Sequence, residues 1–255
     1  MKPLSLGLAL LVLMTFVPPA TAASSATDAE REIMRSVNQA RVDRGLVPLR
    51  SDYRLFILAD DRARVMASAE ILSHGIAGSL SATLDGRSIQ WYGHGEVIAW
   101  TSATQTSSPA ELFRLWATSP SHWALLTSSS FNYLGVGLAY TNSGLTYGSI
   151  ILTESNDRTG ARAKMVKASV SGNDVRWTWR GADPPMQTHT AGLRDFSVQQ
   201  RTDDGEWVTV ISSTTRTARS VSNRAGGHWY GLRVRARDRA GNVGRWSDEL
   251  RIWVP

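Results

Sequence analysis

The chain has 255 residues, a net charge of +6 and no cysteine, so it contains neither disulfide bonds nor zinc sites built from cysteine. The charge is uneven: residues 23–156 have 10 Lys+Arg and 12 Asp+Glu, whereas residues 157–255 have 17 Lys+Arg and 10 Asp+Glu. A chain of this length accommodates two domains. The basic second half predicts a polyanionic partner such as a cell-wall polymer, an acidic glycan or a lipid, and we expect no nucleic acid partner. A solvated arginine-rich surface without a partner is an equally open alternative.

The first 22 residues are typical of a secretory signal peptide. Lys2 provides the positive start, residues 4–17 form the apolar stretch, and Ala20-Thr-Ala22 is a small-residue cleavage site. The apolar stretch is short for a membrane span, and no later segment is apolar enough for one. We therefore expect a secreted chain, extracellular or associated with the cell envelope, without a transmembrane helix after cleavage. An uncleaved N-terminal anchor is the alternative.

Two helices are predicted after the signal peptide. Thr27-Asp-Ala-Glu30 reads as a capping box, in which two side chains bind backbone N–H groups at the start of a helix. Ile33, Met34, Val37 and Ala40 follow on one face of this helix. Ser51-Asp52 caps the second helix, which we expect to end near Leu72-Ser-His-Gly75. One side of this helix carries Leu55, Leu58, Ala59, Arg62 and Met66. Residues 75–90 show no clear period and are expected to form a loop.

A third helix and a strand pair are predicted in the middle of the chain. Ser108-Pro-Ala-Glu111 reads as another capping box, with Ser108 as the N-cap. Ser119-Pro120 ends that helix, because the residue before a proline is pushed out of the α region, and a short turn then carries His122. Residues 134–140 and 145–152 are expected to form two short strands around a turn.

Four short motifs in this order resemble those of the CAP superfamily, which is also called SCP and includes the pathogenesis-related-1 proteins. They are Ser73-His74, Gly95-Glu-Val-Ile-Ala-Trp100, Trp116-Ala-Thr-Ser-Pro-Ser-His122 and Leu134-Gly-Val-Gly-Leu-Ala139. The resemblance implies a three-layer α/β/α sandwich for residues 23–156. Eukaryotic relatives usually carry disulfides, so the absence of cysteine favours a bacterial source.

Residues 157–160 are predicted to link this domain to an all-β sandwich at residues 161–255, so the fold class is α+β. Short alternating segments indicate strands near residues 163–170, 174–180, 194–201, 206–212, 215–221, 229–238 and 245–254. Tyr230-Gly-Leu-Arg-Val-Arg-Ala236 resembles the sixth strand of a fibronectin type III domain. This resemblance places Tyr230 at a tyrosine corner and Trp177 in the core.

The CAP resemblance also implies a groove lined by His74, Glu96 and His122 that can hold a divalent metal. We expect the two histidines to sit at helix ends and Glu96 in the glycine-flanked loop between them. Two neutral imidazoles suit Zn²⁺ or a similar cation, and a nearby carboxylate can orient an imidazole or act as a general base. Members of this family often have a second acidic residue between the first histidine and the Gly-Glu motif, and Asp85 is the sole candidate for it in this sequence. His94 is a candidate third nitrogen ligand. Glu96 has a structural alternative, in which it ties the groove loops together through hydrogen bonds. We expect no organic cofactor.

These observations predict a secreted bacterial CAP-domain protein whose groove binds a small ligand or a divalent metal. The basic β-sandwich would present that groove at the cell envelope. One alternative is a metal-assisted hydrolase with Glu96 as the general base. Another is an adhesion or interaction protein with a vestigial groove. The family shares a fold more securely than an activity, so the sequence leaves open whether the protein is an enzyme.

Overall fold

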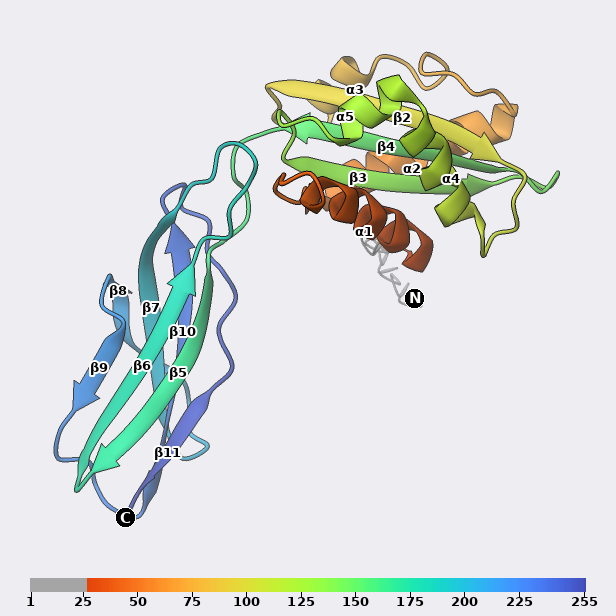
Figure 1. Ribbon diagram of the computed structural model, residues 1–255. Coiled ribbons are helices and arrows are strands. Elements are labelled where there is room, and N and C mark those ends of the chain that lie inside the picture. Colours follow the sequence, from red (N-terminus) through yellow and green to blue (C-terminus); the bar gives the residue numbers. More distant parts are fainter. Residues whose placement is uncertain (1–26) are drawn as a thin grey trace, which may run out of the picture.

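The computed structural model describes residues 27–255, so the predicted signal peptide at residues 1–22 lies outside the described residues. Figure 1 shows a layered α+β domain followed by an elongated β-sandwich, which confirms the predicted fold class. The limits predicted for the two domains and their linker stay predictions. No helix within residues 27–255 combines the length and the apolar character needed to cross a membrane.

The first domain is built on a four-stranded sheet with the order β1-β3-β4-β2. β1 runs parallel to β3, and the other neighbours are antiparallel. Helices α1, α4 and α5 pack on one face of the sheet and α2 and α3 on the other, which gives the three-layer order (Figure 1). The elements are α1 (Asp28–Val42), β1 (Arg50–Ser51), α2 (Tyr53–Ala69), α3 (Leu80–Gly86), β2 (Gly93–Thr101), α4 (Ser108–Thr118), α5 (Pro120–Leu126), β3 (Tyr133–Tyr140) and β4 (Thr146–Glu154).

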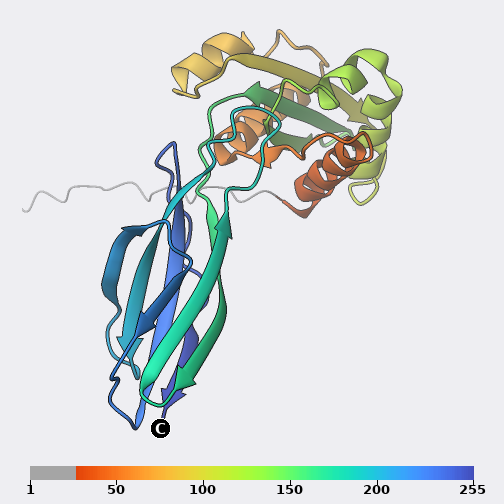
Figure 2. The same cartoon turned by 60° about the vertical axis from the view of Figure 1, so that its left-hand side comes forward.

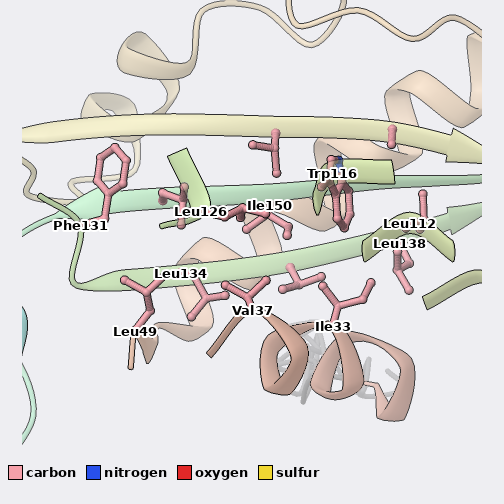
Figure 3. Close-up of a cluster of buried hydrophobic side chains, with 14 of the residues drawn as sticks. Ile33, Val37, Leu49, Leu112, Trp116, Leu126, Phe131, Leu134, Leu138 and Ile150 are labelled. Atoms are coloured by element: carbon pink, nitrogen blue, oxygen red, sulfur yellow. The ribbon is translucent and has the colours of Figure 1, made fainter. Parts of the chain in front are cut away.

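The larger core of this domain lies between the sheet and α1, α4 and α5. Figure 3 shows Ile33 and Val37 of α1 directed towards the sheet, and Trp116 of α4 is fully buried in the same cluster. Each large apolar side chain buried in this way contributes about 1.5–3 kcal/mol to folding. The helical spacing of Ile33 and Val37 in the sequence therefore identifies the core face of α1.

Helix ends agree with the sequence in part. The capping box at Thr27 is confirmed, because Glu30 N donates to Thr27 Oγ1 and Thr27 N donates to Glu30 Oε2. The predicted box at Ser108 is wrong: α4 already includes Ser108, and Glu111 binds the guanidinium of Arg114 instead of reaching back to the N-cap.

Three expectations around the predicted groove are also corrected. α2 ends at Ala69, before the predicted end, because Glu70 takes the left-handed conformation with φ of 52°. The region expected to be a loop contains α3, whose first turn is capped by Ser79. Glu96 lies within strand β2 and not in a loop, since β2 extends from Gly93 to Thr101.

The second domain packs a four-stranded sheet, β11-β10-β7-β8, on a three-stranded sheet, β5-β6-β9. Trp177 is fully buried between them, and the Tyr230 hydroxyl donates to the carbonyl of Ala225, the bond expected of a tyrosine corner. The strands are β5 (Arg162–Ser171), β6 (Asp174–Ala182), β7 (Leu193–Thr202), β8 (Val208–Thr214), β9 (Ala218–Val221), β10 (His228–Asp238) and β11 (Leu250–Val254).

Two glycines of β3 allow the backbone of α2 to lie directly on the sheet. A Cβ atom built on Gly135 would stand 2.1 Å from the carbonyl carbon of Leu55, and one on Gly137 would stand 2.1 Å from the backbone nitrogen of Asp60. No side chain fits in this space, because the atoms in the way belong to the helix backbone. The glycines therefore set the distance between α2 and the sheet.

We expect Gly135→Ala to lower the free energy of unfolding by about 1–3 kcal/mol or more, because the added methyl group must push α2 away from β3. Urea unfolding followed by tryptophan fluorescence measures this loss. Gly86→Ala is the matched control, since a Cβ there meets no atom within 4 Å. Equal free energies of unfolding for Gly135→Ala and Gly86→Ala would contradict the close approach of the α2 backbone to β3.

Candidate functional site

The three residues of the predicted groove come from three different elements. His74 lies in the loop between α2 and α3, Glu96 in β2, and His122 in the short helix α5. The expectation that both histidines sit at helix ends is wrong for His74, because α2 ends five residues earlier. The loop that carries His74 is therefore placed by side-chain contacts and not by a helix.

Glu96 accepts four hydrogen bonds, two on each carboxylate oxygen. Oε1 accepts from Arg62 Nε at 2.5 Å and from Ser149 Oγ at 3.1 Å. Oε2 accepts from Arg62 Nη2 at 3.0 Å and from His74 Nδ1 at 2.8 Å. A carboxylate has about four lone-pair positions, so every acceptor position of Glu96 is used within the protein.

Arg62 is the partner that holds Glu96, and sequence reasoning placed it only on the buried side of α2. The side chains of Arg62 and Glu96 are 3% and 6% exposed, so this is a buried ion pair. Arg62 also donates to the carbonyl oxygens of His74 and Gly78, which fixes the loop between α2 and α3. The sequence carried one signal for this pair: Arg62 is a charged residue on an otherwise apolar side of the helix. A charged side chain in such a place is rarely buried without a partner of opposite charge.

The bond to Glu96 decides which nitrogen of His74 faces the solvent. An ionised carboxylate only accepts hydrogen bonds, so Nδ1 of His74 carries the proton that is shared with Glu96. The lone pair of the neutral ring is then on Nε2, and the exposed side chain presents it outwards. A carboxylate that orients an imidazole in this way is a common arrangement behind metal-binding histidines.

His122 lies close enough to His74 for their charges to interact. Partial burial lowers the pKa of the His122 imidazole, and the neighbouring His74 lowers it further. His122 therefore favours its neutral form near pH 7. Neutral imidazole is the form that binds metals.

The three groove residues do not form a ready three-ligand metal site. Within residues 27–255, only Asp157, Asp183 and Asp238 form a trio of His, Cys, Asp or Glu side chains with ligand atoms all within 4.8 Å of one another. Glu96 Oε2 and His74 Nδ1 meet at 2.8 Å, so the residue that fails to complete a trio within this distance is His122. His122 also does not line the open depression that His74 and Glu96 share.

Of the other two candidates, His94 borders this group and Asp85 does not. His94 lines an open depression of about 380 Å³ together with Arg62, His74 and Glu96, and it also packs edge-on against Trp91 at 4.7 Å between ring centroids. Asp85 is exposed on α3 and accepts a hydrogen bond from Trp91 Nε1. Asp85 is thus used to hold a tryptophan, and it is not among the residues that line the depression.

Comparison with known proteins identifies the first domain. Residues 34–153 match the cysteine-rich secretory protein family, CAP. These residues form a CAP domain. This chain has no cysteine, so the domain is held by packing and the contacts described above. No curated protein matches the sequence significantly.

Similar solved structures include two bacterial proteins that match the CAP domain and a human domain that matches the sandwich. An outer surface protein of Borrelia burgdorferi is 15% identical with a TM-score of 0.45, and the match covers 51% of this chain and 97% of that protein. An extracellular SCP-domain protein of Bacillus anthracis is 23% identical with a TM-score of 0.41, and the match covers 48% of this chain but only 40% of that protein. The fourth fibronectin type III domain of a human protein is 20% identical with a TM-score of 0.32, covering 40% of this chain and 84% of that domain.

We expect Glu96→Gln to destabilise the CAP domain by roughly 3–5 kcal/mol, because it leaves the Arg62 charge buried without a counter-charge. Urea unfolding of the full chain measures this change. Glu111→Gln is the control. Glu111 pairs with Arg114 through two hydrogen bonds on the surface of α4, so this variant should lose little free energy of unfolding. A small and equal effect in both variants would show that the buried pair does not hold the groove.

In metal-free protein, the His122 pKa should lie below the ordinary 6.5, since burial and the neighbouring His74 both disfavour its charged form. His74→Gln should raise that pKa, because it removes the charge and leaves only the burial. Histidine NMR resonances followed across a pH titration give both values. An unchanged His122 pKa in His74→Gln would place the two rings too far apart for a shared site.

Proposed function

We propose that the CAP domain is a binding module in which His74 and His122 together hold a divalent metal ion or a small ligand. The observation that carries this proposal is the hydrogen bonding of Glu96. One of its four bonds holds Nδ1 of His74, which leaves Nε2 of this exposed side chain for a ligand, while burial and His74 favour the neutral form of His122. Two imidazoles, one of them fixed by a carboxylate, suit ligation by nitrogen.

The same contacts speak against Glu96 as a general base. A base must reach the proton that it abstracts with a free lone pair, within hydrogen-bond distance. Arg62 and Ser149 occupy the positions on Glu96 that a water would need, and Arg62 holds the carboxylate from both sides. We therefore favour ligand binding over metal-assisted hydrolysis.

Zn²⁺ is the cation that best fits the donors. His74 Nε2 and the ring of His122 would hold it, and Glu96 would act through its bond to His74. A zinc ion held by two protein ligands offers its remaining positions to water or to an anionic group of a ligand. With only two protein ligands, we expect modest affinity.

The second domain is proposed to present the CAP domain at the outer surface or the envelope of a bacterial cell. Its charge predicts a polyanionic partner, and several of its arginines stack on tryptophans. Arg233 lies between two rings, 4.2 Å from the centroid of Trp207 and 5.1 Å from that of Trp246. Arg201 and Arg235 extend this stack at its two ends. Such stacking keeps the guanidinium charge while fixing its position.

Zinc should raise the melting temperature of the full chain, because it binds only the folded state, and at 100-fold excess over the dissociation constant the gain is about 2.7 kcal/mol. Differential scanning fluorimetry of protein prepared without an affinity tag measures this shift. We expect His122→Ala to abolish it, and His74→Gln to do the same.

His228→Gln controls for zinc bound at other histidines. His228 lies in the second domain and pairs with Asp203, so its loss should leave the zinc shift unchanged. A shift of the same size in His122→Ala and the wild type would overturn the proposed site and favour an adhesion protein whose groove is vestigial.

A further inference from the structure

The two domains are joined by a segment of the sandwich that docks on the CAP domain. The connection between β6 and β7 reaches the CAP domain in both views (Figures 1 and 2). Gln187 accepts a hydrogen bond from Val47 N, and His189 bonds Glu154. Met186 is buried with the apolar residues of α2 and the sheet. The junction is therefore a packed contact and not only a flexible connection.

Three carboxylates from separate segments meet at this junction. Asp157 follows β4 of the CAP domain, Asp183 follows β6, and Asp238 ends β10. One ligand oxygen from each lies within 4.8 Å of the other two. Asp157 and Asp238 are buried, and the side chain of Asp183 is 1% exposed. Three buried negative charges at this spacing repel one another strongly unless cations neutralise them.

The protein supplies one positive charge to this group. Arg50 Nη1 lies 2.7 Å from Asp157 Oδ1, and the same guanidinium contacts Thr159 and the carbonyl of Pro184. Arg158, also in the connection, binds Asp52 instead. Three carboxylates and one guanidinium leave a net charge of −2, which a divalent cation would balance.

One oxygen in the group has no hydrogen-bond partner among residues 27–255. Asp183 Oδ2 accepts from Gly192 N at 2.7 Å, but Asp183 Oδ1 is buried and accepts none. Its nearest cationic group is Arg50 Nη2 at 3.9 Å, which is too long for a hydrogen bond. A buried carboxylate oxygen left in this way costs free energy that a bound cation would recover.

We propose that Asp157, Asp183 and Asp238 bind a calcium ion that locks the sandwich to the CAP domain. The donors are all oxygen atoms, which hard cations prefer, and oxygens that share one Ca²⁺ at 2.3–2.6 Å lie at most about 5 Å apart. Asp238 accepts only two hydrogen bonds, both from Asn242, so it keeps lone pairs for an ion. A cavity of about 510 Å³ between the domains borders Arg50, Thr159 and Pro184, and none of the three aspartates lines it.

The proposal predicts that calcium stabilises the full chain. Protein stripped with EGTA should gain several degrees in melting temperature on addition of calcium chloride, with a dissociation constant on the order of 0.1–1 mM, as in extracellular calcium modules. Magnesium should shift it less, because Mg²⁺ demands a near-ideal octahedral site. Calcium should also slow tryptic cleavage after Arg158, since this residue lies in the locked connection.

Asp183→Asn separates calcium binding from folding. It keeps the shape of the side chain and removes one charge, so we expect a loss of calcium affinity of at least about tenfold. Without calcium, its melting temperature should equal or exceed that of the wild type, because one repulsive charge is gone. Asp248→Asn is the control: Asp248 is exposed in the same domain, and its calcium response should match the wild type.

Asp238→Asn takes the place of Asp183→Asn if the latter fails to fold. A wild type whose melting temperature does not respond to millimolar calcium would overturn the proposal. So would an equal shift by magnesium, or an Asp183→Asn variant with the wild-type response. None of these outcomes depends on zinc binding at His74 and His122.

Discussion

The buried ion pair between Arg62 and Glu96 is the constraint on which the candidate site depends. Both side chains are almost fully buried, so each would be costly without the other. Arg62 comes from α2 and Glu96 from β2, and their contact ties one helical layer to the edge strand of the sheet. The remaining donors of Arg62 hold the loop that carries His74. The pair therefore links the packing of the domain to the geometry of its groove.

This arrangement changes the role of the acid in the groove. A glutamate beside two histidines suggests a ligand or a base when only residue types are known. Four hydrogen bonds make Glu96 an orienting group, whose effect is transmitted through the proton on His74 Nδ1. The atoms that remain for a ligand are ring nitrogens. They are Nε2 of His74 and the nitrogens of the His122 ring, whose neutral form is favoured. These contacts are the basis on which we propose that the site binds a ligand.

A second set of charges, at the junction of the domains, is organised in the opposite way. Arg62 and Glu96 balance each other, whereas Asp157, Asp183 and Asp238 share the single guanidinium of Arg50. The first group is complete within the protein. The second leaves one buried oxygen of Asp183 without a hydrogen-bond donor, and this asymmetry distinguishes a structural ion pair from a candidate cation site.

The sequence by itself determined the layers and most of their elements. Thr27 and Glu30 mark the first helix, the spacing of Ile33 and Val37 gives its core face, and the alternation around Trp177 gives a sandwich strand, because capping and periodicity are local. Motif order also brought His74, Glu96 and His122 together as candidates. It missed α3 and placed Glu96 in a loop, because short helices and strand limits depend on distant neighbours.

Only the tertiary structure decided what those candidates do. The lone pairs of Glu96 are taken by Arg62, which is 34 residues away in the sequence, and nothing local to Gly95-Glu96 signals that partner. Asp157, Asp183 and Asp238 likewise carry no common motif, because they come from three segments that meet only when the sandwich docks on the CAP domain. Hydrogen-bond saturation and charge balance are properties of neighbours in space, so they are settled only after the chain has folded.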